Sequence, residues 1–145
     1  MYTRILCPLD GSKTAESVLP FVRLWARNFQ IPIELLAVVD VVNMMRSVRA
    51  AESLFMDSLV EHETRKLDQY LNDIAKNFPH RTVRCRVQKG SPADVIIEAV
   101  FPERGGLIAM ADWQTRLGEL RAANEMTARQ ARLRVRRNRE SCLIG

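Results

Sequence analysis

Residues 4–12 read RILCPLDGS, a short apolar run that ends in a polar turn. An apolar run bounded in this way is typical of a buried strand that leads into a helix. The hydroxyl of Ser12 or Thr14 would cap that helix, because it can accept a hydrogen bond from a free N–H group of the first turn. We therefore expect a strand at residues 4–9 and a helix at residues 14–28.

Helical periodicity appears in three segments. The first, 14–28, carries an apolar stripe that would face a sheet, formed by Val18, Val22, Trp25 and Phe29. The second, 47–78, contains no Gly or Pro and carries the stripe Leu67, Tyr70, Leu71, Ile74 and Phe78. The third, 92–100, begins with the helix-start residues Ser91, Pro92 and Asp94.

Three further segments are typical of strands. Residues 33–42, IELLAVVDVV, are almost continuously apolar, as expected for a strand covered on both faces of a parallel sheet. Residues 82–87 alternate between apolar and polar, which predicts an edge strand, and residues 107–111, LIAMA, predict a fourth short buried strand. This alternation of strands and helices requires right-handed crossovers, so we predict an α/β fold with an open parallel sheet and helices on both faces.

Ligands in such sheets bind beyond the carboxyl ends of the strands, where the strand order reverses. The segment from Asp10 to Ser12 and the residues after Met110 occupy such positions in the predicted fold. We therefore expect the functional site at this edge of the sheet.

The composition narrows the class of protein. A chain of 145 residues that is 47% hydrophobic is long enough for a single domain, 1–145, with its own core. Three cysteines without ligand spacing argue against a disulfide scaffold or a zinc module. No stretch reaches the roughly 20 apolar residues of a membrane helix, and the first residues lack the apolar region of a signal peptide. We expect a cytoplasmic protein with no membrane partner.

The net charge of +5 is concentrated in one segment. Residues 1–111 carry 14 Lys and Arg against 13 Asp and Glu, a balance of +1. Residues 112–140 carry eight Arg against four acids, a balance of +4, and no Lys. The charge balance of this atypical Arg-rich segment thus differs from that of the rest of the chain.

The segments ILCPLDGSKTAESVLPFV, IELLAVVDVV, VRCRVQKGSPADVIIEAV and GGLIAMA, in this order and spacing, resemble the universal stress protein family over residues 3–111. The resemblance implies a five-stranded parallel sheet in the order 3-2-1-4-5 and, usually, a homodimer. It also implies a division of members by whether they bind ATP. The edge position expected for residues 82–87 agrees with that order.

ATP-binding members carry a glycine signature after the fourth strand, G-x-x-G, then nine residues, then G-S or G-T. Its backbone N–H groups cradle phosphates. Residues 112–144 contain a single glycine, Gly118, so the signature is missing, and Ala128 and Arg129 stand where the Gly-Ser pair would align. We expect adenine-nucleotide binding to be weakened or lost. The alternative is an ATP-binding member that uses Arg129 in place of the glycine loop.

The resemblance also implies a set of nucleotide-binding residues. Asp10 matches the acidic residue beside the adenosine, Val38 the position that contacts the base, and Gly90 the turn beneath the ribose. Asp10 could equally order the turn or cap the first helix, and Gly90 could serve ordinary turn chemistry. The full set is Pro8, Asp10, Gly11, Ser12, Val38, Gly90, Met110 and Arg129.

The sequence contains no recognisable catalytic motif, whether a Ser-His-Asp order, paired carboxylates or a Walker lysine. His62 and His80 have no ligand-spaced partner. The cysteines fall in strands or a strand candidate, where Cys behaves as a small hydrophobe: Cys7, Cys85 and Cys142. We expect neither an enzyme nor a metal site.

Three interpretations of the Arg-rich segment stay open. It forms a divergent helix at 115–137 and a short strand at 142–144, or it arose from a frame shift or an engineered replacement, or it is a new binding element. Several arginines on one helix would suit nucleic acid or an anionic surface as the ligand. Trp113 is the only aromatic residue after Met110, so a stacking platform is missing, and a solvated basic face is the simpler interpretation. The arginines concerned are Arg129, Arg132, Arg134, Arg136, Arg137 and Arg139.

Overall fold

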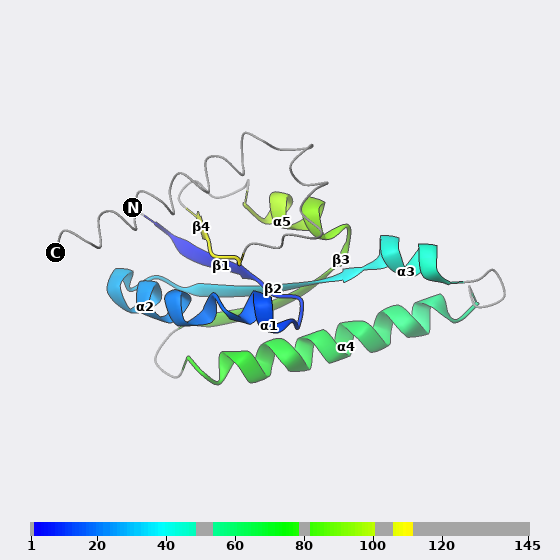
Figure 1. Ribbon diagram of the computed structural model, residues 1–145, viewed down its shortest axis with the longest axis horizontal. Helices are drawn as coiled ribbons and strands as arrows, with labels where there is room; N and C mark the ends of the chain where they lie inside the picture. Colours follow the sequence, from blue (N-terminus) through cyan, green and yellow to red (C-terminus); the bar gives the residue numbers. More distant parts are fainter. Residues whose placement is uncertain (1, 49–53, 79–81, 101–105, 112–145) are drawn as a thin grey trace. The chain divides into compact units, whose positions relative to one another are not determined.

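Four parallel strands form the sheet in the computed structural model, which describes residues 2–48, 54–78, 82–100 and 106–111 (Figure 1). Their order across the sheet is β3-β2-β1-β4. The bounds are β1 Arg4–Pro8, β2 Ile33–Asp40, β3 Val83–Gly90 and β4 Gly106–Ile108. The predicted α/β class and parallel sheet are confirmed, and this order agrees with 3-2-1-4. The fifth strand expected at 142–144 lies outside the described residues.

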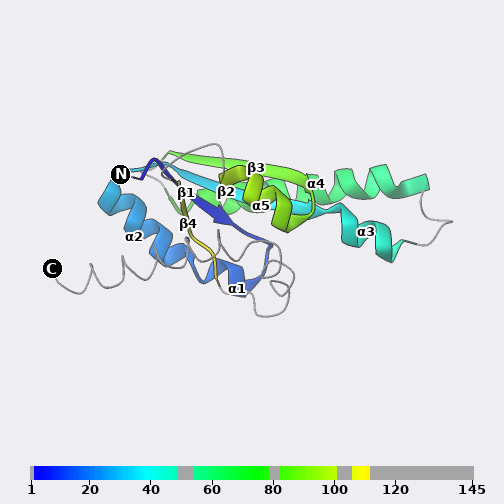
Figure 2. The ribbon, with the colours of Figure 1, turned by 90° about the horizontal axis from the view of Figure 1, so that it is seen from above.

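Helices cover both faces of the sheet (Figures 1 and 2). On one face lie α1 Lys13–Glu16, α2 Leu19–Phe29 and α4 Met56–Ala75. On the other face, α5 Pro92–Val100 packs with Leu6 and Leu36 through Val95, Ile96 and Ala99. Because side chains alternate along a strand, the neighbours of Leu6 and Leu36 fill the core beneath α2 and α4.

The helix predicted at 14–28 is two helices, α1 and α2. Pro20 has no N–H group, so the carbonyl of Glu16 has no helical partner, and the proline ring would clash with it. The backbone therefore leaves the helix at Ser17 and starts again, with the N–H groups of Phe21 and Val22 both donating to the Val18 carbonyl, at 3.0 and 3.1 Å. The prediction of a single helix was wrong because it gave more weight to the apolar spacing than to this proline.

The buried face of α2 also differs from the predicted stripe. Val18 and Val22 are buried as expected, but Trp25 is only half-buried and Phe29 is 42% exposed. The residues of α2 that enter the core are Leu19, Val22 and Ala26. Since the helix restarts at Val18, its core face follows the spacing from Leu19, and Phe29 packs edge-to-face on Tyr2 at 5.8 Å between ring centroids.

The second strand ends two residues earlier than predicted, at Asp40, where α3 Val41–Ser47 begins. The Asp40 carboxylate caps α3 by accepting hydrogen bonds from the Asn43 N–H group at 3.0 Å and the Asn43 side-chain amide at 2.9 Å. The helix predicted at 47–78 is corrected to the shorter α4, Met56–Ala75, while α3 occupies the end of the predicted second strand. Residues 49–53 lie outside the described part of the chain. The predicted stripe holds: Leu71 and Phe78 are buried, and Leu67, Tyr70 and Ile74 are half-buried.

The third strand is longer than the predicted 82–87, because it continues pairing with β2 as far as Gly90. It lies at the end of the described sheet, which confirms the predicted edge position. Helix α5 matches the predicted bounds. The fourth strand ends at Ile108 rather than 111, although the Ala109 N–H group still donates to the Leu6 carbonyl at 2.9 Å.

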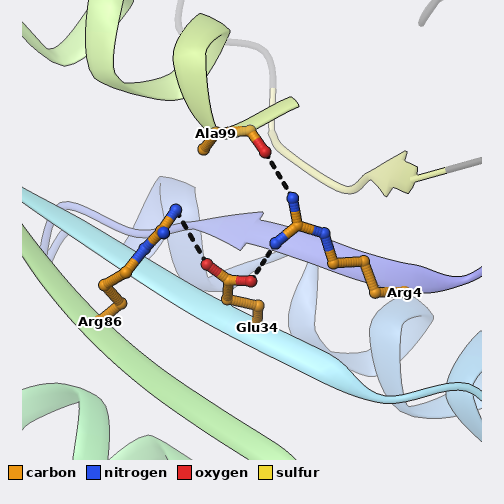
Figure 3. A network of polar contacts seen from close by, with 4 residues as sticks. All are labelled: Arg4, Glu34, Arg86 and Ala99. Atoms are coloured by element: carbon orange, nitrogen blue, oxygen red, sulfur yellow. Dashed lines mark hydrogen bonds and ion pairs between the residues drawn. The ribbon is translucent and has the colours of Figure 1, made fainter. Parts of the chain in front are cut away.

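A buried carboxylate links three strands and a helix (Figure 3). Glu34 on β2 is 5% exposed and lies between Arg4 of β1 and Arg86 of β3. Its Oε2 accepts a hydrogen bond from Arg4, and its Oε1 lies 3.0 Å from Nη2 of Arg86. Arg4 also donates to the Ala99 carbonyl in the last turn of α5. Glu34 is thus a single carboxylate that contacts two guanidinium groups within the fold.

Glu34→Ala should lower the free energy of unfolding by about 3 kcal/mol, because it leaves two partly buried arginines without their carboxylate. Urea denaturation followed by circular dichroism measures the change. The matched control is Glu61→Ala, which removes an exposed ion pair with Arg65 (3.4 Å) and should cost less than about 0.5 kcal/mol. Equal losses in the two variants would show that the buried network contributes no more than a surface pair.

Candidate functional site

The carboxyl ends of the strands bring together residues that are far apart in the sequence. Pro8, the last residue of β1, pairs with Leu36, and β2 continues to Asp40, which pairs with Gly90 at the end of β3. The β1 loop, Val38 and Gly90 therefore lie at one edge of the sheet, and Met110 follows β4 at the same edge. Of the predicted binding set, Arg129 lies outside the described residues.

The loop after β1 is a tight turn ordered by its own side chains. Gly11 has φ = +84°, a conformation that favours glycine. The Ser12 N–H group donates to Oδ1 of Asp10 at 2.9 Å, and the Ser12 hydroxyl accepts from the Ala15 N–H group at 3.1 Å. Ser12 is therefore the cap of α1, and Asp10 orders the turn while its side chain stays exposed.

An apolar surface flanks this turn on the α5 side of the sheet. Val38 and Met110 are half-buried, and both pack against the cluster that joins α5 to β1 and β2. Val38 lies in β2 and Met110 follows the end of β4, and neither side chain is fully enclosed. They could contact a flat apolar group placed over the ends of the strands.

Gly90 is required by packing as well as by backbone conformation. Its φ is +146°, and a Cβ atom at this position would lie 3.1 Å from Cγ2 of Val95. Gly11 differs, because a Cβ atom there would meet nothing within 4 Å. A side chain at position 90 would therefore require Val95 on α5 to move by a few tenths of an ångström.

Gly90→Ala should lower the free energy of unfolding by roughly 2 kcal/mol, since it adds a steric contact with Val95 to an unfavourable backbone conformation. Gly11→Ala is the control, and its cost of about 1 kcal/mol comes from conformation alone. Thermal unfolding of both variants gives the comparison. If Gly90→Ala is no worse than Gly11→Ala, Val95 moves aside without cost.

A hydrogen bond joins α4 to α1, the helix that follows the β1 loop. The Tyr70 hydroxyl on α4 donates to Oε1 of Glu16 on α1 at 3.0 Å. Burial raises the pKa of Tyr70, and the hydrogen bond to Glu16 and the negative charges of Glu16 and Asp10 raise it further. We did not foresee this contact from the sequence, where Tyr70 appeared only as a member of an apolar stripe. A buried tyrosine hydroxyl usually requires a partner, which is the signal that could have revealed it.

Reactive groups are scarce at this edge. Cys7 is buried in β1, and burial raises the pKa of its thiol to about 12. Burial, and then the charge of Asp68, raises the pKa of Cys85. His62 is exposed on α4, and His80 and Cys142 lie outside the described residues.

Neither a metal cluster nor a membrane helix occurs in the described part of the chain. Within it, no three His, Cys, Asp or Glu side chains are grouped so that they could hold a metal ion. Its helices are also too short or too polar to cross a membrane.

Comparisons with known proteins identify the family of the chain. The model of the universal stress protein family matches residues 1–123. The chain belongs to the universal stress protein family. The predicted resemblance over 3–111 is thus confirmed, and the match reaches beyond it. A search of curated proteins finds no match.

Solved universal stress proteins share the fold. UspA from Lactobacillus plantarum is 18% identical, with a TM-score of 0.64 over 79% of this chain and 82% of that chain. A family member from Burkholderia pseudomallei is 20% identical, with a TM-score of 0.62 over 85% and 91%. The hypothetical protein MJ0577, solved as a test case of structural genomics, is 25% identical, with a TM-score of 0.67 over 82% and 81%.

Proposed function

We propose that this universal stress protein acts in the stress response without catalysing a reaction, and that its binding of adenine nucleotides is weakened or lost. The observation that carries the proposal is a mismatch at the strand ends. Asp10, Val38, Gly90 and Met110 gather at one edge, whereas the sequence after 111 lacks the glycine signature that would hold phosphates.

The described helices at this edge do not replace that phosphate cradle. In the first turn of α1, the Ala15 N–H group already donates to the Ser12 hydroxyl at 3.1 Å, and the helical bond from the Glu16 N–H group to the Ser12 carbonyl follows at 3.1 Å. The carboxylate of Asp40 caps α3, and Asp94 lies in the first turn of α5. An anion would meet carboxylates where a phosphate-binding protein presents free N–H groups.

The absence of catalysis is proposed from the same groups. A nucleophile must be activated by a nearby base or by a lowered pKa. The pKa of the Cys7 thiol is raised rather than lowered, and the Ser12 hydroxyl caps a helix. The groups at the carboxyl ends of the strands therefore suit the binding of a ligand or partner more than the cleavage of a bond.

The proposal also covers assembly and location. We expect a single domain over 1–145, a homodimer in the cytoplasm, and neither nucleic acid nor a membrane as a partner. The family relationship supports the homodimer, and the balanced net charge of residues 1–111 does not favour nucleic acid as a partner.

Titration with ATP by isothermal calorimetry should give no saturable heat in the micromolar range. Each charge-assisted hydrogen bond to phosphate that is missing costs about 1.5–3 kcal/mol, so the loss of two or three weakens binding by several orders of magnitude. Adenosine is the control ligand, because it lacks phosphates and should bind no more weakly than ATP.

Micromolar binding of ATP, or ATP that copurifies with the protein, would overturn this view. It would favour an ATP-binding universal stress protein that uses Asp10, Val38 and Gly90 with Arg129. The variant Asp10→Asn would then test whether the carboxylate contacts the nucleotide.

The concentration of arginine after residue 111 favours one further candidate, binding of nucleic acid by the segment itself. Such binding releases counterions and weakens steeply as salt increases. We expect only feeble retention of DNA or RNA at physiological salt, whether or not residues 129–139 are present. A strong, salt-dependent interaction that disappears on deletion of 129–139 would establish the nucleic-acid function instead.

A further inference from the structure

The third strand, β3, has one unpaired edge within the described sheet. It pairs with β2 along its whole length, from Val83 beside Ile33 to Gly90 beside Asp40. No other described strand pairs with β3. Its opposite edge therefore presents a row of backbone N–H and C=O groups, which is a template for an additional strand.

The register of β3 identifies the backbone groups in this row. The Ile33 N–H group donates to the Thr82 carbonyl at 2.9 Å. In a strand, the N–H and C=O groups of one residue point to the same side and successive residues alternate, so the even-numbered residues from 82 to 88 bond with β2. The odd-numbered residues direct their backbone groups away from β2, and we call these groups the β3 edge. They belong to Val83, Cys85, Val87 and Lys89.

The side chains of β3 divide between the two faces of the sheet. Val83, Cys85 and Val87 are half-buried on the face that α4 covers. Arg86 lies on the opposite face, on the same side of the sheet as α5 (Figure 3), and Arg84 shares that face because side chains alternate. A strand added at the β3 edge would therefore place its side chains alternately beside apolar groups and beside arginines.

The face that carries Arg84 and Arg86 has more bases than acids on the described strands. Glu34 already contacts both Arg4 and Arg86. The other acid that these strands contribute, Asp40, caps α3. Since Arg84 is exposed, a carboxylate from outside could approach it directly. Positive charge is thus available beside the β3 edge.

The same arginines disfavour a second copy of β3 as the added strand. In an antiparallel pair, residues that lie opposite each other have their side chains on the same face. A two-fold pair of β3 strands centred near Arg84 and Arg86 would therefore place arginine opposite arginine, which destabilises the pair. Charge complementarity points to an acidic occupant rather than to self-association.

We propose that the β3 edge binds an extended acidic segment of a partner protein, which adds a strand to the sheet. Its acidic residues alternate with apolar ones, so that the carboxylates lie beside Arg84 and Arg86 and the apolar side chains lie on the α4 face. Hydrogen bonds to the β3 edge provide affinity, and the alternation of side chains provides specificity. Binding there uses none of the residues predicted to bind nucleotide, so it goes beyond the proposed function.

A fluorescein-labelled peptide in which four Glu alternate with four Val, as long as the eight residues of β3, tests the binding to the full chain. We expect a saturable increase in fluorescence anisotropy that weakens as salt is increased. The control peptide has the same composition, with the four Glu before the four Val. Because it cannot place all its carboxylates on one face of a strand, it should bind about tenfold more weakly.

Reversal of one charge tests the arginine face. Arg84→Glu should raise the dissociation constant of the alternating peptide about tenfold, since a cross-strand pair changes from attractive to repulsive. Arg84 is exposed, so the variant should keep the wild-type melting temperature. Arg27→Glu makes the same change at an exposed position on α2 and should leave binding unchanged.

Amide hydrogen exchange tests the backbone pairing. Binding of the alternating peptide should slow exchange at Cys85 and Val87 about tenfold, because their N–H groups gain partners. Exchange at Arg84 and Arg86 should change little, since their N–H groups already face β2. Val87→Pro removes one outward donor and keeps the pairing with β2, so it should weaken binding while circular dichroism shows that the fold persists.

Four results would overturn this assignment of the β3 edge. Equal binding of the two peptides would show that charge alone explains the association. The absence of saturable binding, or binding that leaves exchange at Cys85 and Val87 unchanged, would show that no strand is added. If single-stranded DNA binds, Arg84→Glu abolishes this and the alternating peptide does not compete, the arginine face is a nucleic-acid surface instead.

Discussion

The burial of β2 on both faces is the constraint on which the other elements depend. Ile33, Leu35, Leu36 and Ala37 are at most 1% exposed, so helices must cover the strand from both sides. The chain meets this requirement by placing α2 and α4 on one face and then crossing to the other with α5. That crossing sends the chain past β2 and β1 to β4, and the reversal of strand order at this point creates the site at the carboxyl ends of the strands where Asp10 and Met110 lie.

Burial patterns predicted the sheet well, and local hydrogen-bonding chemistry decided where the predictions failed. The continuous apolar run 33–42 predicted a central strand, and the alternation at 82–87 predicted an edge. The same apolar signal continues through Val41 and Val42, yet the strand stops because the Asp40 carboxylate caps a helix by accepting a hydrogen bond from the Asn43 N–H group in its first turn. Similarly, the spacing of Val18 and Val22 predicted one continuous helix, but Pro20 has no N–H group and divides it into two.

Only those residues of the candidate site that lie at the carboxyl ends of strands could be predicted from the sequence. The β1 loop, Val38, Gly90 and Met110 do reach one edge, as the parallel order requires. The contacts of Glu34 with Arg4 and of Tyr70 with Glu16 join residues 30 and 54 positions apart, and no local pattern encodes such a pairing. A charged residue inside an apolar strand, such as Glu34, signals only that a partner must exist.

The rate at which the Cys7 thiol is alkylated reports how often β1 separates from its neighbouring strands. Its thiol is inaccessible in the central strand pair, with the pKa raised to about 12, so an alkylating reagent can modify it only when β1 separates from its neighbours. Cys85, half-buried in the edge strand β3, is reached by smaller fluctuations. The ratio of the two labelling rates therefore compares the opening of the centre of the sheet with fraying at its edge, in a chain that needs no added probe.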